Sequence, residues 1–125
     1  MNCDIKIERI EVNFSICQVE DYSMVDFSQW FCFTGRTNQE NSLVCMTERV
    51  PENATVRDDG WKAFRIQGKL DFSLIGILSG ISAALAEKQI GIFAISTYNT
   101  DYILVKEEQY RKAAQTLEEH GYDII

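Results

Sequence analysis

The sequence has little of what several common kinds of site require. Its 125 residues contain one histidine, one proline and four cysteines, and no Cys-x-x-Cys pair is present. A zinc site usually draws four Cys or His ligands from such spacings, so we expect no metal and no cofactor. An even number of cysteines also allows disulfides, but their apolar contexts favour free thiols in a reducing compartment. These are Cys3, Cys17, Cys32 and Cys45.

Long hydrophobic runs are also missing. No stretch approaches the roughly 18 continuous apolar residues of a membrane span. The first residues, Met-Asn-Cys-Asp-Ile-Lys, do not form a basic region followed by an apolar core, so we expect no signal peptide. The expected location is the cytoplasm.

Positive charge is scarce. Twelve basic residues face 19 acidic ones, which gives a net charge of -7. Residues 1–60 carry -6 of this charge, and residues 61–125 carry only -1. Binding to nucleic acid or to an anionic membrane depends on Lys and Arg, so this balance opposes both. It also opposes RNA binding by a β-α-β-β-α-β sheet, which needs aromatic residues framed by basic ones.

Catalytic motifs are absent as well. The sequence contains no Gly-x-Ser-x-Gly, His-Glu-x-x-His or P-loop pattern. Its single histidine, His120, stands at the C-terminal end of an expected helix and has no evident nucleophile as a partner; it is typical of a solvated residue at a helix end. No cysteine stands beside a cationic cluster that would lower its pKa. We expect a protein that is not an enzyme.

What is present is a pattern of strands and two helices. Hydrophobic residues make up 46% and charged residues 25%, as in globular domains. Alternation and apolar runs predict strands, and apolar stripes with a helical period predict helices. The expected strands are 5–19, 30–34, 42–46, 62–67, 92–95, 102–105 and 122–125; the expected helices are 74–89 and 107–120. From Trp61 onward this order is β-α-β-β-α-β, the ferredoxin-like motif.

The chain is expected to divide near its only proline. Residues 48–60 contain Pro51 and many polar side chains, which are typical of a linker. The hairpin at 92–107 also resembles the segment 30–48, which indicates an internal repeat. We therefore predict a degenerate unit at 1–55, a linker at 56–60 and a complete unit at 61–125.

The most informative stretch is the hairpin of residues 91–105. Residues 96–101 join its strands with hydroxyls, an amide and a carboxylate, more hydrogen-bonding groups than a plain turn needs. This block, together with residues 70–73, 76–78 and 85–86, resembles the ACT domain family. The likeness is to tandem-ACT proteins that include the cytosolic arginine sensors of the TOR pathway and small bacterial relatives. The first half is similar through residues 34–37 and 40–45.

The resemblance implies an α+β fold and a non-enzymatic regulatory protein that binds an amino acid between two ACT units. The free N–H groups at the start of the 74–89 helix suit the ligand carboxylate, and Asp101 suits its ammonium group or a cationic side chain. One implied wall consists of Leu70, Asp71, Phe72, Ser73, Ile75, Gly76 and Ile77. The other consists of Thr97, Tyr98, Asn99, Thr100 and Asp101.

Simpler interpretations of these residues remain open. Asp71 and Ser73 are also ordinary helix caps, and Asp101 is also an ordinary turn residue. A ligand-free interaction module, with the acidic first half as its partner surface, is the alternative function. ACT-like sheets commonly join at their edges, so we expect a homo-oligomer, such as a dimer, and a regulated protein partner. Gly35 and Arg36 stand where the second half has Thr97 and Tyr98, so a matching wall would come from another chain.

Overall fold

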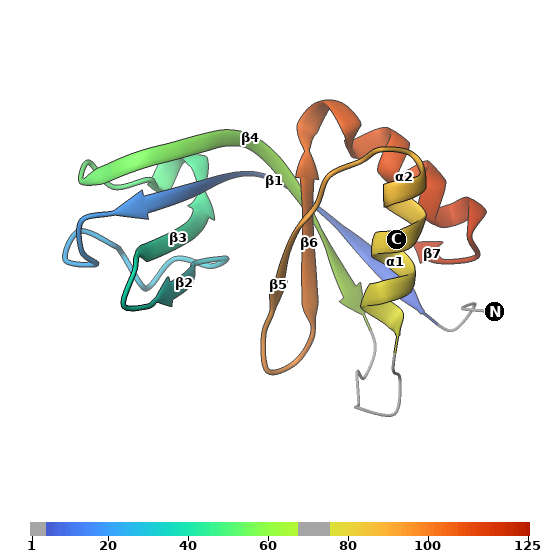
Figure 1. The fold of residues 1–125 in the computed structure, drawn as a ribbon, viewed down its shortest axis with the longest axis horizontal. Helices are drawn as coiled ribbons and strands as arrows, with labels where there is room; N and C mark the ends of the chain where they lie inside the picture. The colour runs from blue at the N-terminus through green and yellow to red at the C-terminus, as the bar shows by residue number, and fades with distance from the viewer. Residues whose placement is uncertain (1–4, 68–75) are drawn as a thin grey trace. The chain divides into compact units, whose positions relative to one another are not determined.

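The protein consists of two compact units, drawn in Figure 1. The structure is a computed structural model that describes residues 5–67 and 76–125. The first unit combines Met1–Glu11 with Lys62–Ile125, and the second unit is Val12–Trp61. The amino-terminal residues thus belong to the same unit as the carboxy-terminal half.

Two long strands, β1 (Lys6–Val19) and β4 (Ala54–Gln67), contribute residues to both units. β1 confirms the strand predicted over residues 5–19. β4 corrects the linker predicted over residues 48–60, because the chain is already extended from Ala54 onward. The β-branched residues Thr55 and Val56 suit an extended conformation and outweigh the polar character that indicates a linker. The domain limits at residues 55 and 61 stay a prediction.

The first unit contains a sheet and two helices. The sheet order is β7, β1, β4, β6, β5. From β4 onward the elements follow as β-α-β-β-α-β, as predicted. β7 pairs in parallel with β1, with Lys6 opposite Asp123, so it does not lie next to β4. The elements after β4 are α1 (Ile77–Glu87), β5 (Phe93–Ser96), β6 (Asp101–Lys106), the 3-10 turn η2 (Glu107–Gln109), α2 (Tyr110–Glu119) and β7 (Asp123–Ile124).

Both helices pack on one face of this sheet, as Figure 1 shows. Phe64 and Ile66 of β4 are buried in the helix-side core, whereas Arg65 between them is only half-buried, because alternate strand residues point to opposite faces. The buried core also includes Ile7, Ile81, Leu85, Ile103, Val105, Ala113 and Leu117.

The helix ends differ from the expected ones by a few residues. α1 begins after Gly76, whose φ of 90° is left-handed and does not continue a helix backward. A 3-10 turn occupies residues 107–109, so α2 begins at Tyr110. As predicted, α2 ends before Gly121. The φ of Gly121 is 93°, and the Tyr122 N–H donates back to the Leu117 carbonyl.

The second unit is built from strands, with order β2, β3, β1, β4. β2 (Phe33–Arg36) is antiparallel to β3 (Asn41–Met46), which leads into the 3-10 turn η1 (Thr47–Arg49). The strand predicted at 30–34 begins later, because Phe31 has a φ of 58° and interrupts the extended chain. The core of this unit includes Cys17, Val19, Leu43 and Cys45.

The cysteines that the structure describes form no disulfides. Cys17, Cys32 and Cys45 are free thiols, and Cys3 lies outside the described residues. None of the helices in residues 5–67 and 76–125 is both long and apolar enough to cross a membrane.

Candidate functional site

The turn between β5 and β6 is closed by its own polar side chains. Ser96 Oγ donates a hydrogen bond of 2.6 Å to Asp101 Oδ1. The Thr97 N–H donates to the Thr100 carbonyl at 2.8 Å, and Thr97 Oγ1 lies 2.9 Å from the same oxygen. The predicted block of residues 96–101 is therefore an ordered turn whose hydroxyls hold its shape.

Thr100 also ties this turn to the neighbouring strand. Its Oγ1 donates to the carbonyl oxygen of Ile66 in β4 at 2.6 Å. Ile66 is the penultimate residue of β4, so the turn lies beside the point where the chain leaves that strand. Five predicted site residues follow there and lie outside the described residues: Leu70, Asp71, Phe72, Ser73 and Ile75.

The amino terminus of α1 is the third part of the predicted site. Figure 1 shows it at the same end of the first unit as the end of β4 and the β5–β6 turn. Gly76 precedes the helix and offers no capping side chain, and a Cβ there would meet nothing within 4 Å. The first N–H groups of an α-helix have no intrahelical acceptor, and the helix dipole makes this end positive. Among the described residues, no side chain caps the start of α1 with a hydrogen bond.

The predicted residues of the turn differ in exposure. Asp101 is half-buried, and apart from Ser96 its carboxylate has no hydrogen-bond partner in the described parts of the chain. Thr97 and Asn99 are exposed, and Tyr98 is fully exposed. No residue that the structure describes therefore covers the Tyr98 ring.

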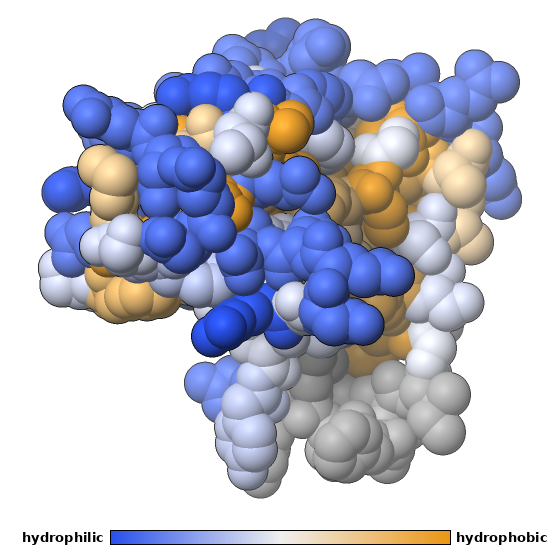
Figure 2. Space-filling view, turned by 60° about the vertical axis from the view of Figure 1, so that its left-hand side comes forward, coloured by the Kyte–Doolittle hydropathy of each residue, from blue (hydrophilic) through white to orange (hydrophobic). Residues whose placement is uncertain are grey.

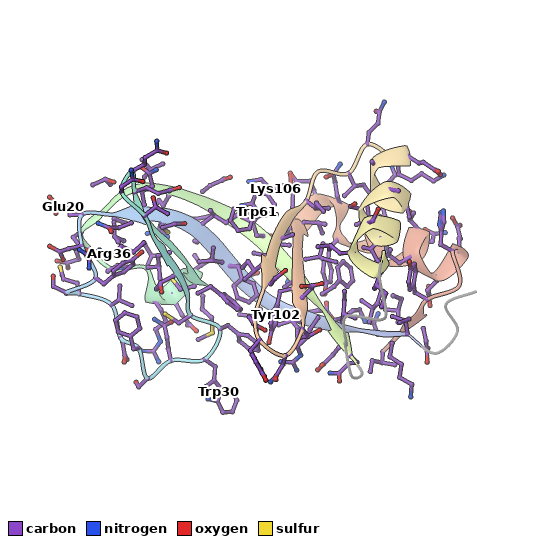
Figure 3. All side chains as sticks on the ribbon, turned by 60° about the horizontal axis from the view of Figure 1, so that its bottom comes forward. Glu20, Trp30, Arg36, Trp61, Tyr102 and Lys106 are labelled. Carbon is purple, nitrogen blue, oxygen red and sulfur yellow. The ribbon has the colours of Figure 1, made fainter. Side chains whose placement is uncertain are left out.

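A polar network next to the turn was not predicted from the sequence. Glu8 Oε1 accepts from Arg65 Nη2 at 2.8 Å and from Arg65 Nε at 3.2 Å, and it also accepts from Gln67. Arg65 Nη1 donates to the Tyr102 hydroxyl at 3.2 Å, and the guanidinium carbon lies 5.7 Å from the centre of that ring. Figure 3 labels Tyr102 on β6. In the sequence, this network is indicated only by Arg65, a charged residue between two apolar strand residues.

The charges of this network stabilise each other. The hydrogen bond from Arg65 is the main cause that lowers the pKa of Glu8, and burial opposes it. The hydrogen bonds to Tyr102 and Glu8 raise the pKa of Arg65. Both groups therefore stay charged at neutral pH, and the ion pair holds β1, β4 and β6 together on the face opposite the helices.

The single histidine lies at the end of a helix. His120 lies at the end of α2, where its Nδ1 is 2.9 Å from the Thr116 carbonyl. Its Nε2 is 4.0 Å from Glu87, an exposed partner. Within residues 5–67 and 76–125, no three His, Cys, Asp or Glu side chains gather in a way that could hold a metal ion.

The two hairpins of the chain share one geometry at an interval of 60 residues. Phe33 pairs with Val44 in the second unit, and Phe93 pairs with Leu104 in the first. Each hairpin turn contains a threonine, Thr37 or Thr97, and each is followed by a 3-10 turn. By this register Thr37 corresponds to Thr97. The correspondence of Gly35 and Arg36 with Thr97 and Tyr98, which was predicted from the sequence, is therefore wrong.

Several solved structures are similar to this chain. Protein Atu0741 from Agobacterium tumefaciens is 29% identical, with a TM-score of 0.86, over 97% of this chain and 92% of that one. VC0802 from Vibrio cholerae, described as a protein of unknown function and possible transport protein, is 21% identical, with a TM-score of 0.72, over 94% and 90%. The ligand-free regulatory subunit of aspartate kinase from Thermus thermophilus is 8% identical, with a TM-score of 0.60, over 92% and 95%. The last two show a shared fold alone.

Sequence comparison points to one family. No curated protein matches the chain. The model of the ACT domain matches residues 56–119, which include β4 from Val56 onward, both helices, and the β5–β6 hairpin with its turn. This is just over half of the 125 residues. The chain belongs to the ACT domain family.

Proposed function

We propose that this protein is a non-enzymatic regulatory protein that binds an amino acid at the end of the first unit. The observation that carries the proposal is the placement of the β5–β6 turn and the start of α1 at one end of an ACT domain, with Thr100 bonded to the end of β4. The regulatory subunit of aspartate kinase, a protein of similar fold, supports a regulatory role.

The chemistry of the two described parts suits the two charges of an amino acid. The N–H groups that begin α1 would receive the carboxylate. Asp101 would receive the ammonium group, and such a charge-assisted hydrogen bond contributes about 1.5–3 kcal/mol. The predicted site also includes residues 70–73 and 75, which lie outside the described residues.

We further propose that the second unit is a degenerate ACT-like unit. The shared hairpin register, 60 residues apart, and the threonine in each turn support this. The chain would work in the cytoplasm as a homo-oligomer, joined at a sheet edge such as β5. A second chain would supply the opposite wall of the site, and ligand binding would favour one assembly that a partner protein recognises. Kinship with the arginine sensors of the TOR pathway is part of the same hypothesis.

Thermal unfolding with each of the twenty amino acids tests the proposal. A ligand present at about 100 times its Kd stabilises the folded state by about 2.7 kcal/mol. For a chain of this size that raises Tm by roughly 8–13 °C. Asp101→Asn keeps an acceptor for Ser96 but removes the charge, so it should abolish most of this shift. Glu119→Gln removes an exposed charge from α2 and should keep the shift. If no amino acid raises Tm at 10 mM, the proposal fails.

A second candidate function is a protein-interaction module without a small ligand. Exposed apolar side chains in the second unit favour it. A stable partner whose affinity is unchanged by every amino acid would support this function over the first.

A further inference from the structure

The loop between β1 and β2, residues 20–32, has a fixed shape although it contains no regular element. The Asp21 carboxylate accepts from the Ser23 N–H at 3.0 Å, and the Asp26 carboxylate accepts from the Ser28 N–H at 2.9 Å. The hydroxyls of both serines donate to the same carboxylates and, with these N–H bonds, lower both pKa values. The loop is thus held by two side-chain turns whose carboxylates stay charged.

The side chains of this loop divide into an inner and an outer set. Tyr22, Val25 and Cys32 pack on the core of the second unit. Three large apolar side chains at intervals of three residues are exposed instead: Met24 at 50%, Phe27 at 62% and Trp30 at 80%. We call these three residues the apolar strip. Figure 2 shows hydrophobic residues at the surface among hydrophilic ones on the side of this unit. Exposed apolar side chains that gather in one surface patch mark interaction sites, and Trp is enriched where binding energy concentrates.

A buried, unsatisfied amide belongs to Gln29, the residue before Trp30 of the strip. Both polar atoms of the Gln29 side chain are buried and have no hydrogen-bond partner among residues 5–67 and 76–125. A buried polar group without a partner costs about 1–3 kcal/mol, so such a group asks for an explanation. A Gln amide offers one acceptor and two donors, which can pair with both backbone groups of an extended chain after a side-chain rotation.

A charged hollow lies beside the strip. Its volume is about 370 Å³, and it is lined by Glu20, Asp21, Tyr22, Ser23, Arg36 and Asn41. The Tyr22 ring, which lines the hollow, lies 6.4 Å from the Phe27 ring of the strip. Figure 3 shows Glu20 and Arg36 at one end of the loop and Trp30 at the other, so the whole surface is elongated.

The charge of this unit selects the kind of partner. Val12–Trp61 contains eight acidic and three basic side chains, a net charge of -5. A second copy would bring two strongly negative surfaces together, whereas a positive partner would be attracted. We propose that the apolar strip and the hollow form a docking site for an extended, basic segment of another protein. Apolar side chains of the segment contact the strip, one Lys or Arg enters the hollow beside Glu20 and Asp21, and its backbone pairs with Gln29.

Three defined peptides test the chemistry of the segment. The probe repeats Lys-Leu-Ser three times, so that basic and apolar side chains recur along one extended segment. One control replaces Leu by Ser and keeps the charge; the other replaces Lys by Glu and keeps the leucines. We expect fluorescence anisotropy to show binding of the probe at least tenfold tighter than either control. Equal binding of the probe and the Ser control would mean charge attraction alone and would overturn the proposal.

Variants of the chain test the place of binding. Phe27 and Trp30 are exposed, so the double variant Phe27→Ser, Trp30→Ser should keep the fold intact. It should bind the probe at least tenfold more weakly. Val56→Ser is the matched control, since Val56 is a 58% exposed apolar residue of the same unit. Unchanged binding by the double variant, or its loss in Val56→Ser, contradicts the assignment. If sedimentation shows that the double variant abolishes self-association, the occupant is a second copy and the proposal is wrong.

Gln29→Leu separates binding from folding. A leucine removes the buried unpaired amide, so Tm should rise. The same change removes the backbone pairing, so binding of the probe should weaken at least threefold. A variant that is more stable and binds the probe as tightly as before would exclude Gln29 from the docking site.

Discussion

Thr100 Oγ1 lies 2.6 Å from the carbonyl oxygen of Ile66 and fixes the β5–β6 turn against the end of β4. The turn therefore does not depend on its own strands alone. A ligand that bound to this turn would also be positioned relative to the end of β4. One hydroxyl thus couples two of the three parts of the candidate site.

Removing that hydroxyl should loosen the turn. Thr100→Val keeps the shape but leaves the Ile66 carbonyl without this donor, so the free energy of unfolding should fall by about 1 kcal/mol. Thr100→Ser keeps the hydroxyl and should lie close to the wild type. Urea unfolding measures both. Equal stabilities of the two variants would show that the hydrogen bond does not contribute.

The ion pair of Glu8 and Arg65 should make the free energy of unfolding depend on pH in the acid range. The folded-state pKa of Glu8 is lowered, chiefly by the hydrogen bond from Arg65, below its ordinary value of about 4.3. Its stabilisation is therefore fully present above pH 4.3 and is lost as the pH falls through the folded-state pKa. Glu8→Gln should be less stable than the wild type at pH 7, and the difference should narrow toward pH 3.

Glu11→Gln is the control for this pH dependence. Glu11 lies on the same strand but is exposed. Its substitution should shift the unfolding curve little at either pH. If the loss of unfolding free energy in Glu8→Gln stayed constant from pH 7 to pH 3, the ionised Glu8 carboxylate would not be the cause of the stabilisation.

The element order could be predicted from local patterns. Alternation over residues 62–67 predicted part of β4, and apolar stripes with a helical period predicted α1 and α2. Such patterns are informative because a half-buried strand or helix shows its buried face in the sequence. The pairing of β7 with β1 could not be predicted, since it joins Lys6 to Asp123 across almost the whole chain. No local signal carries such a register.

The candidate site was predictable only where its residues are neighbours in sequence. Thr97, Thr100 and Asp101 form one turn, so their polar character was visible as a block. The contact of Glu8 with Arg65 joins residues 57 positions apart and follows from the insertion of β1 next to β4. The exposure of the Trp30 side chain could not be predicted either, because a large apolar residue is usually expected to be buried.

The two hairpin threonines should respond alike. Thr37 Oγ1 accepts from the Glu40 N–H at 3.2 Å, and Thr97 Oγ1 accepts from the Thr100 N–H at 3.3 Å. Thr37→Val and Thr97→Val should each lower the free energy of unfolding by about 1 kcal/mol. Thr34→Val, at an exposed strand position, should change it by less than about 0.5 kcal/mol. Urea unfolding that finds one turn variant neutral would show that the turns are not equivalent.

Gly80 and Tyr122 should be coupled through one close approach. A Cβ at Gly80 would lie 3.1 Å from the Tyr122 hydroxyl, so Gly80→Ala forces that side chain to move. Without this contact, alanine would stabilise the helix by about 1 kcal/mol over glycine. Gly80→Ala should therefore be neutral or destabilising in the wild type and stabilising with Tyr122→Phe. Gly76→Ala is the control: its φ of 90° should cost about 1–2 kcal/mol in both backgrounds. A double-mutant cycle by urea unfolding measures the coupling, and a zero coupling energy for Gly80 would mean that the hydroxyl does not exclude the methyl group.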